Sequence, residues 1–428
     1  MRVAFFTLGC KVNQYETQVI REEFLKAGHT AVEEGAQFDV VIINSCTVTA
    51  ESDRKTRQVV HRFRRENPNA VIVLTGCMVQ AFSQEAKELT DADIVVGNTD
   101  TRKILQLTEQ FLADGERIFE FTPHTREENF NTPSISSFAE RTRAYMKIED
   151  GCNRYCSYCI IPTARGFVRS KPVAEIKEEA EVLAQKGFSE VVLVGINLSA
   201  YGKDEDLNLC DAVDAVCEVD GIKRVRLGSL EPDHISDSML ERFKNQAKFC
   251  PQFHLSLQSG CDATLKRMNR HYDSAFYADL VERIRKMFPD AAITTDIMVG
   301  FAGETEQEFE QSVAFLKKIG FSKAHVFAYS RRKGTVAYSL PGQITRAEKS
   351  ERSKIMLAAA AECETAFLKS QAGKLHEVLF EVCENGVAEG YTANYLRVCV
   401  NTTENLEGKI KKVKIVSTKG EIAFGEIV

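Results

Sequence analysis

The run Asp150-Gly151-Cys152-Asn153-Arg154-Tyr155-Cys156-Ser157-Tyr158-Cys159-Ile160-Ile161-Pro162 decides how the rest of the chain is interpreted. Its three cysteines stand at C-x3-C-x2-C spacing, which places three thiolates in one short loop after the strand-like segment 144–148. A [4Fe–4S] cluster has four irons, and each normally takes one Cys thiolate, so three cysteines leave one iron open to another ligand. A structural zinc site is the alternative, but such sites usually pair C-x2-C with a second close pair or with His, and no such partner lies nearby. The loop therefore predicts an iron–sulfur cluster with one open iron.

A second set of three cysteines lies upstream, and each of them ends a strand-like apolar run. Cys10 follows 3–9, Cys46 follows 40–45 and Cys77 follows 71–76, with helical patterns between them. This β-α-β-α-β order predicts a parallel sheet, in which ligands gather at the carboxyl ends of the strands. The alternative is that each cysteine is a small apolar residue in a core, the usual fate of a free Cys. Because all three have the same structural position, we expect a second three-thiolate site.

Composition limits the class of protein. A chain of 428 residues with 44% hydrophobic content predicts two or three domains with buried cores. No stretch approaches the apolar length of a membrane span and the start has no signal-peptide profile, so we expect a cytoplasmic protein. Thirteen cysteines in such a chain indicate metal ligands or reduced thiols rather than disulfides.

The pattern along the chain predicts an α/β protein with three domains. Residues 1–120 form the α/β parallel-sheet unit with the first three cysteines, and 121–140, rich in Thr, Asn, Ser and Pro, form a linker. Six βα units within 141–370 predict a partial (βα)6 barrel with its active site at the carboxyl ends of the strands. Residues 371–428 contain short alternating runs and predict a small antiparallel β barrel. The six barrel strands are expected at 144–148, 191–196, 225–229, 254–258, 293–299 and 324–329.

Two basic segments indicate RNA contact. The net charge of −6 argues against a uniformly basic nucleic-acid protein, but binding needs only a local basic stripe. One stripe lies within the helical pattern 54–65, and the other contains Arg331, Arg332 and Lys333 beside Tyr329 and Tyr338. The alternative is a solvated helix face and a basic loop.

The cluster loop, with its preceding strand and following Ile-Ile-Pro turn, resembles the radical S-adenosylmethionine (SAM) superfamily. The resemblance implies that SAM chelates the open iron and that an electron from the cluster splits SAM to a 5′-deoxyadenosyl radical. With both cysteine sets in register, nearly the whole chain resembles the methylthiotransferases, radical SAM transferases that insert sulfur at an unreactive C–H bond and methylate it. This implies two [4Fe–4S] clusters, an auxiliary one and one for SAM, and a C-terminal TRAM domain that binds RNA. The implied ligands are Cys10, Cys46 and Cys77 for the auxiliary cluster and Cys152, Cys156 and Cys159 for the SAM cluster.

The opening Thr7-Leu8-Gly9-Cys10-Lys11-Val12-Asn13-Gln14-Tyr15-Glu16-Thr17 resembles the MtaB branch of that family. This implies methylthiolation at C2 of N6-threonylcarbamoyladenosine (t6A) at tRNA position 37, with the anticodon stem-loop, SAM and an electron donor as partners. The alternatives are isopentenyladenosine, a ribosomal-protein aspartate, or an iron–sulfur RNA-binding protein without catalysis. Segments 224–232, 255–260 and 295–301 also match. Ala302 and Ala328 stand where relatives more often have Pro, which alters loop stiffness rather than ligands.

Four residues are candidate SAM contacts because they should project at the carboxyl ends of barrel strands: Gly195, Asn197, Glu231 and Gln258. Ordinary loop capping is the alternative for each. Arg165 and Arg169 follow the cluster loop and could contact a phosphate or the SAM carboxylate, or equally be surface charges. No Ser-His-Asp arrangement, phosphate loop or paired acid set is present, so we expect no catalytic residue beyond the cofactor ligands. The sequence carries no signal for an oligomeric state.

Overall fold

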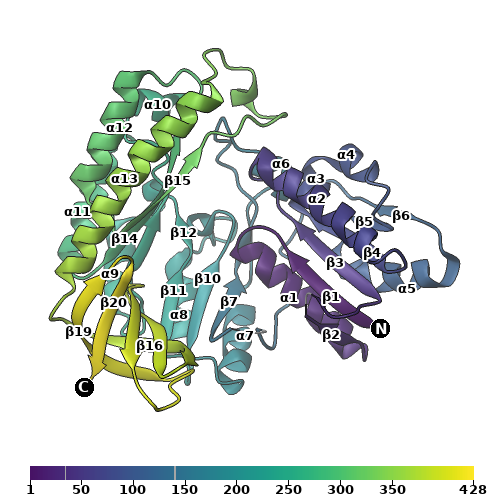
Figure 1. Ribbon diagram of the computed structural model, residues 1–428, viewed down its shortest axis with the longest axis horizontal. Helices are drawn as coiled ribbons and strands as arrows, with labels where there is room; N and C mark the ends of the chain where they lie inside the picture. Colours follow the sequence, from purple (N-terminus) through teal and green to yellow (C-terminus); the bar gives the residue numbers. More distant parts are fainter. Residues whose placement is uncertain (34, 139–140) are drawn as a thin grey trace.

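The computed structural model describes residues 1–33, 35–138 and 141–428 (Figure 1). The N-terminal part is a six-stranded parallel sheet in the order β2-β1-β3-β4-β5-β6. Its strands are β1 (Arg2–Thr7), β2 (Thr30–Val32), β3 (Val40–Ser45), β4 (Val71–Gly76), β5 (Ile94–Val96) and β6 (Ile118–Glu120). Its helices are α1 (Lys11–Lys26), α2 (Ala50–Glu66), α3 (Cys77–Ala81), α4 (Ser83–Lys87) and α5 (Ile104–Asp114).

The central strands of this sheet are buried on both faces. Alternate residues of β3 belong to two separate cores: Val41 and Ile43 pack on the α2 side, whereas Val40 and Ile42 pack on the α1 and α5 side. Continuous apolar runs are what a parallel sheet covered on both faces requires, because successive side chains point to opposite faces. The predicted parallel sheet is confirmed. The short strands β2, β5 and β6 were not predicted.

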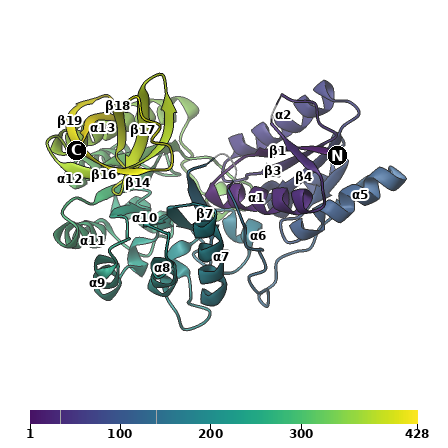
Figure 2. The same cartoon turned by 90° about the horizontal axis from the view of Figure 1, so that it is seen from below.

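The middle of the chain is a partial barrel of parallel strands with helices outside (Figures 1 and 2). One sheet has the order β11-β10-β7 and the other β12-β13-β14-β15, and the break falls between β11 and β12, at Gly228. The strands are β7 (Arg143–Lys147), β10 (Glu190–Val194), β11 (Arg224–Leu227), β12 (Ser229–Leu230), β13 (Gln252–Leu255), β14 (Ala292–Val299) and β15 (Lys323–Ala328). The helices include α7 (Val173–Gln185), α8 (Leu209–Cys217), α9 (Asp237–Asn245), α10 (Asp262–Arg267), α11 (Ser274–Met287), α12 (Glu306–Ile319) and α13 (Arg346–Ser370).

The six predicted barrel strands are all present, with bounds that differ by a few residues. The expected third strand, 225–229, is divided into β11 and β12. Of the two departures from relatives, Ala302 is buried beside Phe301 and Tyr329, whereas Ala328 is exposed at the end of β15.

The C-terminal part is a closed barrel in the order β16-β17-β18-β20-β19. Its strands are β16 (Leu375–Glu384), β17 (Val387–Thr392), β18 (Arg397–Asn401), β19 (Ile410–Lys419) and β20 (Ile422–Ile427). The predicted small barrel is confirmed, although β18 and β20 pair in parallel while the other four pairs are antiparallel. It docks on the larger barrel through buried arginines: Arg224 donates to the carbonyls of Glu377 and Tyr391, and Arg226 to those of Thr392 and Ala393.

The segment between β6 and β7 packs against the first helix. Glu22 of α1 accepts hydrogen bonds from the backbone N–H groups of Ser136 and Ser137, and the Tyr15 hydroxyl donates to the carbonyl of Pro133. Residues 139 and 140 of the predicted linker lie outside the described residues. Among the helices of the described part, none combines the length and apolar character needed to cross a bilayer.

Candidate cofactor and substrate site

Three cysteines meet at the carboxyl edge of the N-terminal sheet. β1, β3 and β4 are neighbours, and Ser45 pairs with Gly76, so Cys46 and Cys77 leave adjacent strands at the same level. Cys10 follows β1 and precedes α1, where its Sγ donates to Asn13 Oδ1 at 3.3 Å. A Cβ on Gly9 would lie 3.0 Å from the Cβ of Cys46, so these two loops are in close contact. The topology therefore brings the three predicted ligands together.

The other three cysteines lie in a loop that the large barrel holds on several sides. Gly151 opens this loop with φ of 88°, and a Cβ there would lie 1.9 Å from the carbonyl oxygen of Phe167, so only glycine fits. Ser157 donates from its backbone to the carbonyl of Met268 at 3.0 Å. Arg270 donates to Cys156 Sγ at 3.1 Å and also holds Glu231. Such contacts orient potential ligands before a cofactor binds.

The thiols of each set influence one another electrostatically. The pKa of Cys77 is raised to about 12, chiefly by burial and with contributions from Cys46 and Cys10, while Arg165 acts to lower it. Burial likewise raises the pKa of Cys159 to about 12, and Cys156 contributes in the same direction. Three thiolates at such a place need a positively charged group between them, as an iron–sulfur cluster provides.

All thirteen cysteines are free, so no disulfide competes for these sulfurs. Within the described residues, no group of three or more His, Cys, Asp or Glu surrounds a single metal ion. A tetrahedral zinc ion would need its ligands within about 2.3 Å, whereas in a cube each thiolate binds a different iron and the sulfurs stand farther apart. Three thiolates at each place are the kind of donors that a [4Fe–4S] cluster uses.

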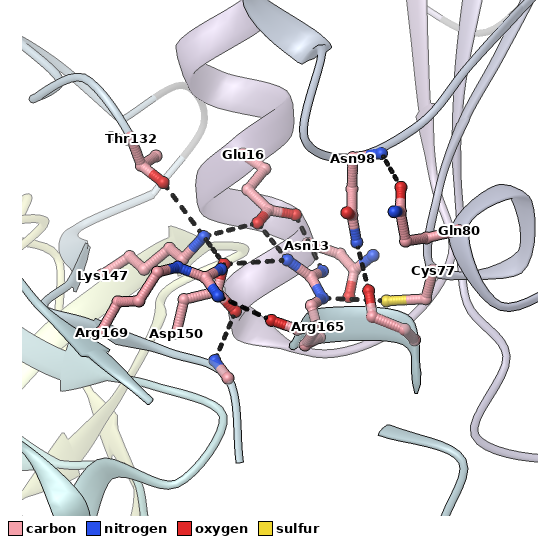
Figure 3. A network of polar contacts seen from close by, with 12 residues as sticks. Asn13, Glu16, Cys77, Gln80, Asn98, Thr132, Lys147, Asp150, Arg165 and Arg169 are labelled. Carbon is pink, nitrogen blue, oxygen red and sulfur yellow. Dashed lines mark hydrogen bonds and ion pairs between the residues drawn. The ribbon is translucent and has the colours of Figure 1, made fainter. Parts of the chain in front are cut away.

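A buried network of ion pairs lies between the two sets of cysteines (Figure 3). It combines Glu16 of α1, Lys147 at the end of β7, Asp150 of β8 (Glu149–Asp150), Arg165 of α6 (Ile161–Arg165) and Arg169 of β9 (Arg169–Ser170). Lys147 Nζ lies 2.7 Å from both Glu16 Oε1 and Asp150 Oδ2. Arg165, only 1% exposed, donates to both carboxylate oxygens of Glu16 and to Cys77 Sγ at 3.1 Å. One guanidinium thus connects the segment after the second cysteine loop to a cysteine of the first set.

A second contact joins the loop after β15 to the loop after Cys46. Arg332 donates to Asp53 Oδ2 and to Thr47 Oγ1, each at 2.7 Å, and its guanidinium lies 4.9 Å from the centroid of the Phe82 ring. Together with the Arg165 contacts, this places the carboxyl edge of the N-terminal sheet against the carboxyl end of the barrel. Both sets of cysteines therefore lie at the junction of the two domains.

The predicted RNA contacts occupy different environments. Arg331 and Lys333 are exposed, and Lys333 is 77% exposed in its side chain. Arg332 is buried, with 4% exposure. RNA contact by Arg331, Arg332 and Lys333 stays a prediction, and Arg332 differs from the other two because it pairs with Asp53 inside the junction. In the other basic stripe, Arg64 likewise binds Asp93.

The four candidate SAM contacts lie at the carboxyl ends of the strands. Asn197 donates its backbone N–H to Glu149 Oε2 at 2.7 Å, and a Cβ on Gly195 would lie 2.5 Å from that oxygen. Glu231 binds Arg270, which reaches Cys156. Gln258 has φ of 69° and exchanges backbone hydrogen bonds with Asp296 and Met298 of β14. Asn197 also lines a cavity of about 330 Å³ beside the cysteine loop, and its Oδ1 has no hydrogen-bond partner. The SAM contacts themselves stay a prediction.

A larger cavity of about 510 Å³ lies inside the partial barrel, bounded by its inner face, by Lys11 and by the C-terminal barrel. Barrel interiors are usually filled by branched apolar side chains. Here the strands contribute many polar and charged side chains: Arg143, Tyr145, Arg226, Gln252, His254, Thr294, Asp296, Lys323 and His325. The size suits one nucleoside-sized ligand.

Comparison with known proteins agrees with this architecture. A family described as the Radical SAM superfamily matches residues 146–316, and the Uncharacterized protein family UPF0004 matches residues 2–97. The chain is 38% identical to threonylcarbamoyladenosine tRNA methylthiotransferase MtaB of Bacillus subtilis (strain 168), over 100% of this chain and 96% of that protein. It is 36% identical to the protein of the same name from Thermotoga maritima, over 97% and 94%. It is 33% identical to tRNA-2-methylthio-N(6)-dimethylallyladenosine synthase of Clostridium perfringens (strain SM101 / Type A), over 99% and 96%.

Among solved structures, the radical SAM methyltransferase TsrM from Kitasatospora setae with cobalamin and a [4Fe-4S] cluster bound has a TM-score of 0.57. The alignment covers 91% of this chain and 80% of that one at 11% identity, so the likeness concerns the fold. Fold and cysteine loop together define a radical SAM enzyme. Within that class, the chain belongs to the family of the MtaB-type methylthiotransferases.

Sequence reasoning missed several residues of the junction. Glu16 had no signal, because it lies in an ordinary helical pattern. Two other residues could have been recognised in the sequence. Lys147 is a charge inside the apolar segment 144–148, and Asp150 lies beside the cysteine loop. Arg165 and Arg169 were noticed, but the expectation of a surface, phosphate or SAM contact is replaced by buried pairing with Glu16 and Asp150. Arg270 comes from a turn with no recognisable pattern.

Proposed function

We propose that this chain methylthiolates C2 of t6A at position 37 of tRNA, giving 2-methylthio-N6-threonylcarbamoyladenosine. The observation that carries the proposal is the 38% identity over the full chain to a protein named for this activity, with all six cysteines gathered at one junction. The cationic cavity favours t6A over isopentenyladenosine, since a carboxylate pairs with Lys or Arg whereas an isopentenyl group gains nothing from a cation.

Residues 141–370 would bind the SAM cluster through Cys152, Cys156 and Cys159, and residues 1–120 an auxiliary [4Fe–4S] cluster through Cys10, Cys46 and Cys77. When bound, the clusters and SAM supply the radical, sulfur and methyl chemistry, which no side chain can supply at an adenine C2–H. The chain's own residues hold the two sites in one junction: Arg165 orients Cys77, and Arg270 orients Cys156. Gly195, Asn197, Glu231 and Gln258 would contact SAM.

The remaining partners follow from this substrate. Residues 371–428 would bind the tRNA anticodon stem-loop as a TRAM-like domain, together with Arg331 and Lys333, and an external electron donor would reduce the SAM cluster. A tRNA substrate of this kind places the enzyme in the cytoplasm.

Mass spectrometry of tRNA nucleosides from a host with and without this gene tests the proposal. We expect the 2-methylthio derivative of t6A to disappear while t6A itself accumulates, and a plasmid copy to restore it. A matched control is a copy with Cys152→Ala, which should not restore it. Normal levels of the product without the gene, or loss of only the isopentenyl derivative, would overturn the assignment.

A further inference from the structure

The cavity inside the barrel is lined by one cation that forms no ion pair within the described residues. Five Lys or Arg residues line it in the described part of the chain, and four of them bind carboxylates. Arg226 pairs with Glu190 at 2.8 Å, Arg397 with Glu389 at 2.7 Å, Lys323 with Glu421 at 3.0 Å, and Arg143 with Glu381. Lys11 has no hydrogen bond and no carboxylate partner among the described residues; its Nζ lies 6.0 Å from the centroid of the Tyr145 ring.

The position of Lys11 connects the cavity to the first set of cysteines. It is the first residue of α1 and directly follows Cys10. Its backbone is held in place because Asn13, two residues on, donates to Asn44 Oδ1 and to the carbonyl of Ser45 at the end of β3. The start of α1 is therefore held beside the first set of cysteines, and the Lys11 side chain lines the cavity, where an unpaired charge is costly.

The other charges facing the cavity do not supply a partner. Glu364 and Glu421 both bind Lys323, and Asp296 lies 3.4 Å from His254 Nε2; in the described part of the chain none of these carboxylates forms an ion pair with Lys11. A half-buried ammonium without an ion-pair partner favours an anionic ligand, and a nucleoside-sized cavity of about 510 Å³ limits that ligand to a small one.

We infer that Lys11 binds the carboxylate of the threonylcarbamoyl group when the modified adenosine enters the cavity, which makes it a specificity-determining residue. This inference rests on the proposed function and refines it, because it names the contact that separates t6A from an apolar isopentenyl substituent. Arg143 stays paired with Glu381 and Arg226 with Glu190, so these two arginines contribute only to the electrostatic potential of the cavity.

The test measures binding of anticodon stem-loops to the cluster-reconstituted protein by fluorescence anisotropy. Three RNAs are compared: one with t6A, one with the threonyl carboxylate replaced by a carboxamide, and one with unmodified adenosine. The wild type should bind the carboxylate form about tenfold or more tightly than the carboxamide form, the size of a charge-assisted hydrogen bond. Lys11→Met should bind the two forms equally, and Lys11→Arg should keep most of the preference.

Two controls keep the result interpretable. Lys244→Met, an exposed lysine on the outer helix α9, should leave the preference unchanged. Iron content is measured for each variant, because Lys11 adjoins Cys10. A Lys11→Met protein that retains iron and still prefers the carboxylate overturns the inference, as does a wild type that does not distinguish carboxylate from carboxamide.

The same assay separates failure of the inference from failure of the proposed function. A wild type that forms the 2-methylthio product from t6A but ignores the carboxylate contradicts only the role of Lys11. A wild type that neither binds t6A more tightly than adenosine nor forms the product contradicts the proposed function itself.

Discussion

Arg165 makes contacts that no other residue of the junction combines. Its guanidinium binds both oxygens of Glu16, lies 3.6 Å from Asp150 and donates to Cys77 Sγ. The planar fork of Arg satisfies these acceptors at once, which the single ammonium of Lys cannot do. The same side chain thus stabilises the interface and orients a predicted cluster ligand.

Replacing Arg165 with Gln should destabilise the protein strongly, because Glu16 loses its bidentate partner and stays buried. Breaking a buried pair in this way typically costs about 3–5 kcal/mol. Urea denaturation of the cluster-free chain measures the change. Arg54→Gln is the matched control, since Arg54 pairs with Glu51 in an exposed position where such pairs contribute little to stability. Equal effects of the two substitutions would contradict the role of the network.

The protonation of Glu16 gives a prediction about pH. Burial alone would raise the pKa of Glu16, but Arg165 and Lys147 outweigh burial and hold this pKa below its usual value. A depressed folded-state pKa means that the stabilisation is complete above the unfolded value of about 4.3 and is lost as pH falls through the folded value. The difference in free energy of unfolding between wild type and Glu16→Gln should therefore be constant near neutral pH and shrink in acid. A difference that grew on acidification would contradict this assignment.

At the scale of elements, the C-terminal barrel is attached to the large barrel by buried arginines as well as by packing. Arg224 and Arg226 donate to its backbone carbonyls, and Arg143 binds Glu381. Removing the barrel would take away these carbonyl and carboxylate acceptors and leave only Glu190 to pair with the arginines. Truncation from about residue 372 is therefore expected to destabilise the remaining chain in addition to weakening RNA binding.

Point substitutions on β19 test RNA binding without this complication. Lys412 and Lys414 alternate with buried Val413 and Ile415, so their side chains point to solvent. Replacing both with Gln should weaken tRNA binding. The negative slope of log K against log salt should become less steep by about 1 for each lost phosphate contact. Lys244→Gln on α9 is the control and should leave the slope unchanged. An unaltered slope in the double variant would show that this face does not contact phosphates.

At the scale of the whole molecule, the junction of the two domains should hold two clusters. Anaerobic reconstitution should give about eight irons per chain, because each [4Fe–4S] cluster contains four. Replacing Cys152, Cys156 and Cys159 with Ala should halve the iron and abolish SAM cleavage, whereas replacing Cys10, Cys46 and Cys77 should halve the iron and leave SAM cleavage uncoupled. An unchanged iron content in the variant that lacks Cys10, Cys46 and Cys77 would contradict the proposed auxiliary cluster.

The sequence by itself determined the elements and the kind of chemistry. The apolar runs of the main sheet and barrel strands are long enough to be recognised in the sequence. The C-x3-C-x2-C motif lies within one short segment, so its three thiolates can be predicted to be neighbours without knowledge of the tertiary structure. Even the convergence of Cys10, Cys46 and Cys77 could be predicted, because parallel strands place their carboxyl ends at one edge.

Only the tertiary structure decided which charged side chains are buried and which residues they pair with. Lys11, Arg165 and Arg332 look like ordinary surface cations in the sequence, and partners such as Glu16 and Asp53 lie 149 and 279 residues away from the arginines that bind them. Pairing over such separations leaves no periodic signal, since it depends on how two domains dock rather than on local propensity. For the same reason, only the structure shows that Lys11 lacks an ion-pair partner among the described residues, whereas the other four cations of the cavity each bind a carboxylate.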